Sequence, residues 1–182
     1  MKTLIWKGIA YESLEYFTLR KREDYTVEST IIGCYQDYLY TVNYQLAIDK
    51  DWKILEFMIE SEINTIKNKI TGRKLHDEWE INTVIDPDFK DFTFIDISLT
   101  PFTNTLPVNN LQLQENTSRV IDVIYIDVLN NNIRPVQQQY TRKNGNNYLY
   151  ENLENDFKAN VLFDEEGLVT EYHQLFKKIA VL

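Results

Sequence analysis

The sequence predicts a mainly β protein built on one strongly bent antiparallel sheet, with one or two short helices. Three observations lead to this prediction: turn residues recur at short intervals, the segments between them alternate between apolar and polar residues, and aromatic residues make up 13% of the chain. Large planar side chains favour a half-buried pleated surface, and regularly spaced turns are typical of all-β domains. The chain has 182 residues, which fits a single domain over residues 1–182.

Alternation along the chain identifies the strands and indicates where the sheet bends. Residues 42–48 and 157–163 carry apolar side chains at every second position, so one face of each strand should be buried. In residues 52–59 the apolar positions change from even to odd, which predicts a β-bulge. Residues 61–70 and 169–178 fit either a strand or a short helix, because helically spaced apolar residues compete with strand patterns there.

The clearest turn is Asn144-Gly145. A type I′ hairpin needs positive φ at both central positions, and this pair tolerates it best. We expect the turn to join a strand that ends near Arg142 to one that contains Tyr148 and Tyr150.

Composition excludes several kinds of partner. The formal net charge is −9, and no stretch gathers Lys and Arg into a patch that could neutralise a run of phosphates, so nucleic acid is not an expected partner. The single cysteine, Cys34, suits a reducing compartment. No apolar run is long enough for a secretion signal or a transmembrane segment, and the expected location is cytoplasmic.

No catalytic apparatus is recognisable in the sequence. The chain has no Gly-x-Ser-x-Gly elbow, no His-Glu-x-x-His metal site and no Cys-x-x-Cys pair. Only 5 glycines are present, which makes a phosphate-cradling loop hard to build. We therefore predict a binding protein that is not an enzyme, with no cofactor and no metal ion.

The most distinctive segment is residues 96–107, Asp-Ile-Ser-Leu-Thr-Pro-Phe-Thr-Asn-Thr-Leu-Pro. Pro101 and Pro107 each fix a φ angle, and the hydroxyl and amide side chains between them can bond to nearby backbone groups. The segment should form a rigid turn or one-turn helix between strands, acting as a plug or corner.

This segment resembles the bacterial putative glycolipid-binding proteins, in which a strand ending in Asp and a small residue runs into Pro-Phe-Thr-Asn-Thr-Leu-Pro. The resemblance extends along nearly the whole chain, through the positions Gly33, Tyr44, Trp52, Gln138-Gln139-Tyr140-Thr141, Phe157-Lys-Ala and Asp164 to Tyr172. The family usually has basic residues after the second proline, where this chain has Val108, Asn109 and Asn110, and a proline where it has His173.

The resemblance implies a spiral β-roll, which is an open, strongly curved sheet akin to a half-barrel, and a glycolipid or other lipid-like ligand. The resemblance supplies no binding residues to carry over, because function depends on the residues of a site rather than on the fold. The candidate site therefore comes from the residues themselves.

Asp96 is the first candidate, because it interrupts an apolar strand between Ile95 and Ile97. Its carboxylate either accepts backbone N–H bonds from the turn at residues 103–105 or lines a cavity and orients a ligand. We prefer the structural role, given the donors that the turn offers. For Asn104 and Gln139 we likewise prefer hydrogen bonding within the turn or sheet, with contact to a ligand as the second interpretation.

Aromatic residues supply the other candidates. Packing of one core explains most of them. The alternative is that the concave face of a curved sheet stays partly unfilled and is lined by rings with a few hydroxyl tips, which suits acyl chains and sugars. Tyr44, Trp52 and Tyr140 are the residues that we expect to line it.

Two other functions are compatible with the sequence. An interaction or scaffold module would have a filled core and an exposed apolar patch. A hydrolase acting on a sugar or lipid would need two carboxylates in one cleft, for which Asp96 and Asp122 are the candidates.

Overall fold

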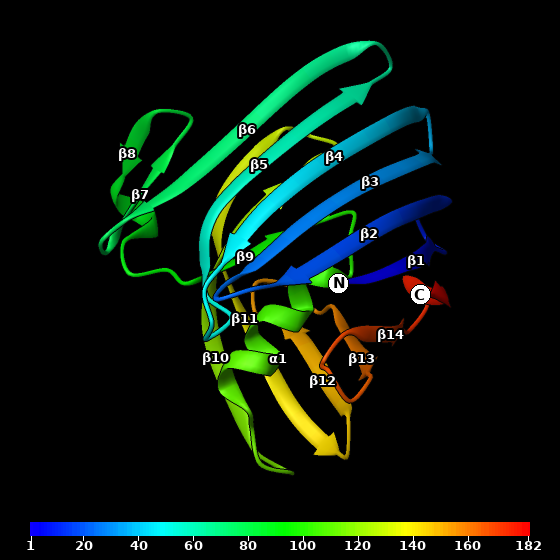
Figure 1. The fold of residues 1–182 in the computed structure, drawn as a ribbon, viewed down its shortest axis with the longest axis vertical. Coiled ribbons are helices and arrows are strands. Elements are labelled where there is room, and N and C mark those ends of the chain that lie inside the picture. The colour runs from blue at the N-terminus through cyan, green and yellow to red at the C-terminus, as the bar shows by residue number, and fades with distance from the viewer.

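The computed structural model describes residues 1–182 and contains one continuous sheet of 15 strands that curls over itself (Figure 1). All neighbouring strands are antiparallel except β9 (Phe94–Ile97), which runs parallel to β10 (Ser118–Asp127). The sheet ends at β8 (Val84–Asp86) and at β9, which do not pair with each other. The predicted mainly β fold with one bent, unclosed sheet is confirmed.

The first half of the chain forms a broad curved layer, in which strands that are consecutive in the sequence are also neighbours in the sheet. Its strands are β1 (Lys2–Gly8), β2 (Ser13–Lys21), β3 (Tyr25–Tyr35), β4 (Tyr38–Ile48), β5 (Ile54–Ile63), β6 (Ile66–Leu75), β7 (Glu78–Ile81) and β8. The 3₁₀ turn η1 (Pro87–Phe89) then leads to the opposite end of the sheet.

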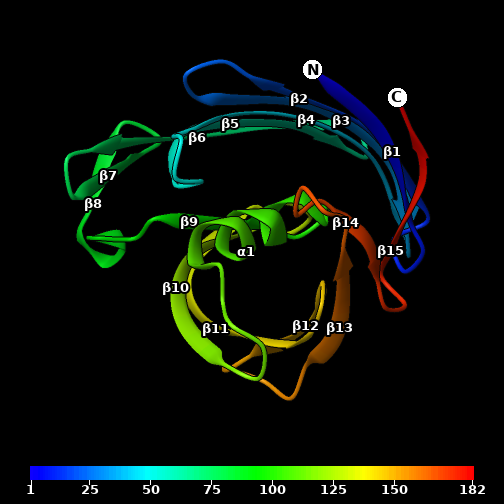
Figure 2. The ribbon, with the colours of Figure 1, turned by 60° about the horizontal axis from the view of Figure 1, so that its bottom comes forward.

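The second half returns strand by strand from β9 to β1 and curls into a half-barrel beneath the first layer (Figure 2). After β10 come β11 (Asn132–Asn144), β12 (Asn147–Asn152), β13 (Lys158–Phe163), β14 (Val169–Tyr172) and β15 (Phe176–Val181). Pairing of β15 with β1 joins the two halves, so the N-terminal and C-terminal strands lie side by side.

A short helical segment fills the space between the two layers, as Figure 2 shows. It consists of the 3₁₀ turn η2 (Phe102–Asn104) and the helix α1 (Thr105–Leu111), and we call residues 100–111 the plug. Residues 100–108 are all buried, and the Phe102 ring lies 4.6 Å from that of Phe17 in β2. A helical segment forms where a turn or one-turn helix was predicted, and it is longer than predicted, because a 7-residue helix follows the 3₁₀ turn.

Local chemistry explains why the plug is helical. The backbone N–H of Phe102 donates to the Thr100 hydroxyl, which starts the turn, and Pro107 lies in the first turn of α1, where a missing N–H costs nothing. The helix ends at Leu111: the N–H of Gln112 makes the last bond, to the carbonyl of Val108, and the left-handed φ of 43° at Gln112 turns the chain away from the helix axis.

The interior is one hydrophobic cluster of 43 buried residues that includes the plug. In β4 every even position from Tyr40 to Ile48 is buried, and in β13 the residues Ala159, Val161 and Phe163 are buried, as the alternation predicts. Phe157, which precedes β13, is instead 39% exposed. No helix is both long and apolar enough to cross a membrane.

The predicted bulge lies at Leu55. Ala47 pairs with Glu56 and Ile48 pairs with Ile54, so Leu55 has no partner across the strand pair. Trp52 precedes the strand, in a turn where its φ is 64°.

The hairpin predicted at Asn144-Gly145 forms, but one residue later. Asn144 pairs with Asn147, so Gly145 and Asn146 occupy the turn, because a register shift at Lys143 moves the strand end forward.

Both ambiguous segments are strands rather than helices. Residues 61–70 turn at Asn64 and Thr65, between β5 and β6. A C-terminal helix does not form in residues 169–178, because β14 and β15 pair with β13 and β1 and thereby bury Tyr172 and Phe176.

We predict that Phe102→Ala lowers the free energy of unfolding by about 3–5 kcal/mol, because it empties the centre of the plug. Urea unfolding measures the change. The control is Leu39→Ala on the outer face, where the side chain is 70% exposed and the effect should stay within about 0.5 kcal/mol. Similar losses for the two variants would show that the plug does not stabilise the roll.

Candidate functional site

The half-barrel encloses a small cavity of about 260 Å³ beside the plug, which we call the chamber. Its lining comes from the loop before β2, from β9, the plug, β10, β12, β14 and β15, and from the turns before β13 and β15. Six of its residues are aromatic: Tyr11, Tyr125, Tyr150, Phe157, Tyr172 and Phe176. Neighbouring rings meet at tilted or edge-to-face angles, so they surround the cavity instead of stacking on one another.

Asp96 is the one charged residue that lines the chamber. In the parallel pair of β9 and β10, Asp96 lies opposite Tyr125, and strand alternation turns both toward the chamber. One carboxylate oxygen accepts from the Thr103 hydroxyl at 2.9 Å and the other from the Gln138 amide at 2.6 Å. Burial raises the pKa of Asp96, and these two hydrogen bonds oppose the rise.

Four tyrosine hydroxyls in the chamber have no hydrogen-bond partner within the chain, namely those of Tyr11, Tyr125, Tyr150 and Tyr172. None of these hydroxyls is completely buried. Burial is the main reason that their pKa values are raised, to about 12 for Tyr11, and the negative charge of Asp96 adds to the rise at all four. Each hydroxyl can donate to and accept from a guest in the chamber.

A second carboxyl group, that of Glu15, is buried behind the chamber wall. Its Oε1 accepts from the hydroxyls of Tyr44 at 2.5 Å, Ser29 at 2.7 Å and Thr100 at 2.9 Å. Its Oε2 is buried without a partner. Burial raises the pKa of Glu15 to about 7, although all three hydroxyls favour the charged form. Thr100 lines the chamber and therefore connects it to this buried carboxyl.

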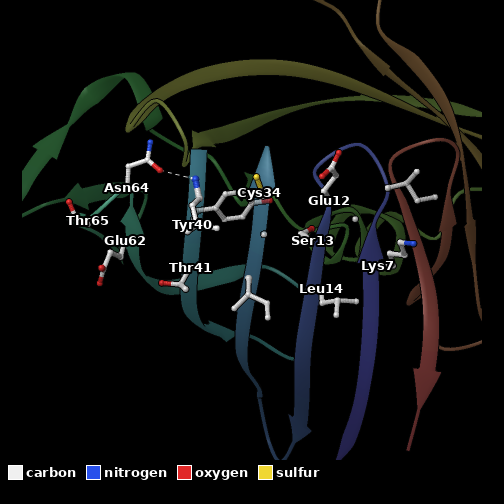
Figure 3. A pocket seen from close by; sticks show the side chains of 15 residues that line it. Lys7, Glu12, Ser13, Leu14, Cys34, Tyr40, Thr41, Glu62, Asn64 and Thr65 are labelled. Carbon is white, nitrogen blue, oxygen red and sulfur yellow. Dashed lines mark hydrogen bonds between the residues drawn. The ribbon is translucent and has the colours of Figure 1, made fainter. Parts of the chain in front are cut away.

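The largest hollow lies outside the roll, on the outer face of β1 to β5, and is about 1050 Å³ in volume (Figure 3). We call it the groove. Direct strand pairing sets Lys7, Leu14, Ile32, Thr41 and Glu62 in one row across its floor. The groove is open: Leu14 is 45% exposed and Ile32 is 53% exposed. It therefore offers an apolar floor between a basic side and an acidic side.

The family model described as putative glycolipid-binding matches residues 3–178. The chain belongs to this family. A crystal structure of a DUF1089 family protein from Pseudomonas aeruginosa is 33% identical in sequence, with a TM-score of 0.82 over 91% of this chain and 92% of that chain. Among curated proteins there is no match.

A beta-barrel-like protein of the domain of unknown function DUF1849 from Brucella abortus shares the fold alone. It is 7% identical, with a TM-score of 0.58 over 99% of this chain and 95% of that chain. The spiral roll of the glycolipid-binding family is thus confirmed for this chain in its overall architecture.

The structure brings three of the six predicted site residues together at the plug. Asn104 and Asp96 both line the chamber, and the Tyr140 hydroxyl donates to Asn104 Oδ1 at 2.8 Å. Asn104 also donates to the carbonyl of Pro101, within its own turn. The turn bonds Asp96 through the side-chain hydroxyl of Thr103 and not through the predicted backbone N–H groups, and Asp96 also faces a cavity.

The other three predicted residues lie elsewhere. Tyr44 is buried behind the chamber wall against Glu15, and Trp52 stacks on Tyr25 at 4.2 Å near the edge of the roll. Gln139 points outward and donates to Glu151. The concave face under the first layer, where an open hollow was expected, is occupied by the plug.

Sequence reasoning missed Gln138, Tyr150 and Tyr172. Gln138 is only 1% exposed and bonds Asp96, and its inward direction follows from the same alternation that buries Tyr140. The two tyrosines come from β12 and β14, which both pair with β13, and their proximity depends on this strand pairing rather than on a local pattern.

The positions where this chain departs from the glycolipid-binding family have structural roles. The Asn109 side chain donates to the carbonyl of Glu166, and the Asn110 side chain donates to that of Asp51. Both tie the end of α1 to neighbouring loops and neither lines the chamber.

The two carboxylates that a hydrolase would need, those of Asp96 and Asp122, do not share a cleft. Asp122 lies three residues before Tyr125 and so points to the opposite face of β10, where it accepts from Gln137. It does not line the chamber that holds Asp96.

We predict that Glu15→Gln changes how stability depends on pH. A carboxyl whose pKa is about 7 when folded and near 4.5 when unfolded binds its proton more tightly in the folded state. The unfolding free energy of the wild type should therefore fall as pH rises through this window, by about 3 kcal/mol between about pH 4 and pH 8. The glutamine variant should lack this component.

Urea unfolding across that pH range measures the difference between the two proteins. The control is Glu28→Gln, whose side chain is 55% exposed and pairs only with Arg20 at the surface. Parallel pH profiles for the wild type and Glu15→Gln would contradict the raised pKa.

Proposed function

We propose that this protein binds an amphipathic small molecule of glycolipid type without catalysing a reaction on it, and that the chamber receives the head group. One observation carries the proposal: an aromatic cavity holds four hydroxyls that bond nothing in the chain, next to a carboxylate. Sugar rings and similar head groups combine apolar faces with hydroxyls, and such a wall complements both. Membership of the putative glycolipid-binding family supports a binding role.

The size of the chamber suits a head group rather than a whole lipid. Pockets that enclose a drug-sized ligand usually measure about 300–1,000 Å³, and the chamber is about 260 Å³. The apolar remainder of the ligand must lie outside.

The groove is the proposed place for the apolar tail. The loop between β1 and β2 separates the two hollows: Tyr11 lines the chamber and Ile9 lines the groove. The Ile9 N–H also bonds the carbonyl of Leu175, a residue of the chamber lining, at 2.7 Å. Apolar side chains of Leu14, Ile32 and Leu39 continue from there.

Binding is favoured over catalysis because of how the chamber carboxylate is held. Both oxygens of Asp96 already accept hydrogen bonds, and no second carboxylate shares the chamber to form an acid–base pair. The thiol of Cys34 lies in the groove, on the other side of the sheet.

We predict that Tyr150→Phe and Tyr172→Phe weaken ligand binding but leave the fold intact. Neither hydroxyl bonds the protein, so the unfolding free energy should change by less than about 0.5 kcal/mol. The affinity for dodecyl glucoside, below its micelle concentration, should fall about three- to tenfold in each variant, as for one lost hydrogen bond. Isothermal titration calorimetry on refolded, lipid-free protein measures the affinity.

The matched control is Tyr148→Phe. Tyr148 lies on the same strand and face as Tyr150 but packs on Phe163 outside the chamber lining, so its loss should leave the affinity unchanged. Absence of dodecyl glucoside binding to the wild type, together with no lipid retained from a cell lipid extract in native mass spectrometry, would refute the proposed function.

We further predict that affinity rises with tail length only when the groove is intact. Extending the tail from hexyl to dodecyl glucoside should raise wild-type affinity by at least about tenfold, because the added methylenes cover apolar surface. The double variant Ile32→Asn with Leu39→Asn should lose this gain. Ile66→Asn, where the side chain is 66% exposed outside the groove, is the control. If the double variant kept the full rise in affinity from hexyl to dodecyl glucoside, the tail would not lie in the groove.

A further inference from the structure

Asp96 carries a negative charge that no basic residue neutralises. No Lys, Arg or His lines the chamber, and Asp96 forms no ion pair. Arg134 lies close, with its guanidinium 5.1 Å from the centre of the Tyr125 ring, but it pairs with Glu154. A buried carboxylate without a counter-charge is costly, and a positively charged guest would remove that cost.

The walls around Asp96 are suited to the same kind of guest. The electron-rich faces of aromatic rings attract cations, and cages of several rings are the usual way in which proteins recognise quaternary ammonium groups. Six aromatic residues line the chamber, and Tyr150, Tyr172 and Phe176 form an unbroken series of ring contacts of 5.9 Å and 6.2 Å.

The negative potential of Asp96 extends through the chamber. After burial, its charge is the next largest cause of the raised pKa of the Tyr11, Tyr125 and Tyr150 hydroxyls. An anionic head group, such as a phosphate monoester, would meet repulsion without any compensating base.

We infer that the chamber recognises a head group that bears one positively charged ammonium, held between the carboxylate of Asp96 and the aromatic walls. This inference rests on the proposed function, because it names the chemical class of the head group in the same chamber. An amino sugar and a choline-type head group share this chemistry. Tyrosine hydroxyls then bond the polar groups around the nitrogen.

The test uses soluble head groups in matched pairs, titrated into the intact wild-type protein and followed by NMR. Choline is compared with 3,3-dimethyl-1-butanol, which has the same shape without the charge, and glucosamine is compared with glucose. We expect the charged member of at least one pair to bind about tenfold more tightly or better. The pair that shows the preference identifies the source of the ammonium.

Two charge-removing variants locate the effect. Asp96→Asn should abolish the preference for the charged member of each pair, and the fold should be kept because Gln138 can turn its amide to keep the hydrogen bond. Asp122→Asn removes the same charge from the outer face of the sheet, where Asp122 bonds Gln137 in the same manner, and should retain the preference.

The outcomes separate this inference from the proposed function. Equal affinity within both pairs, or a preference that survives Asp96→Asn, would overturn the ammonium inference while dodecyl glucoside binding still supports the proposed function. If Asp96→Asn and Asp122→Asn lost the preference equally, the preference would be an effect of net charge alone. That result would also overturn the ammonium inference.

Discussion

Packing of the plug against both layers of the sheet is the constraint on which the rest of the structure depends. Phe102 packs on Phe17 and Thr100 donates to Glu15, which ties the plug to the first layer. Asn104 accepts from Tyr140, which ties the plug to the half-barrel. A sheet this long would otherwise be free to open or to flatten, because its two end strands do not pair. The plug thereby connects the two layers, and the chamber lies beside it.

The chemistry of the chamber follows from that arrangement. Thr103 of the plug fixes one oxygen of Asp96 and Gln138 of the half-barrel fixes the other, so the carboxylate is oriented before any ligand arrives. Oriented polar groups lose little freedom on binding, which favours affinity in a small site. Four unbonded hydroxyls face the cavity, whereas the hydroxyls of Tyr44 and Tyr140 bond Thr100 and Asn104 of the plug.

Local patterns predicted most of the fold. The alternation in β4, the bulge at Leu55 and the rigid segment between Pro101 and Pro107 all follow from the chemistry of neighbouring residues. The Asn144-Gly145 turn was misplaced by one residue, because the shift at Lys143 depends on pairing with β12. The C-terminal segment depends on long-range pairing with β1, which overrides its helical spacing.

The site was less predictable, because the curl of the sheet creates it. Asp96 and Asn104 belong to one motif, so their proximity could be inferred from it, whereas the bond from Tyr140 to Asn104 depends on long-range strand pairing. Tyr11 and Tyr172 are brought together only when the last strands reach the first one, and Glu15 looks like an ordinary surface carboxylate in its segment of the sequence. Gln139 has the hydrogen-bonding role within the sheet that was preferred for it, whereas its neighbour Gln138, which points to the opposite face, was not considered.

A crystal structure of the protein with an amphiphile bound tests the central claim most directly. The account predicts electron density for the head group inside the chamber, in contact with Asp96 and with the hydroxyls of Tyr150 and Tyr172. Density for the head group at the outer surface, with the chamber closed by its own side chains, would contradict it.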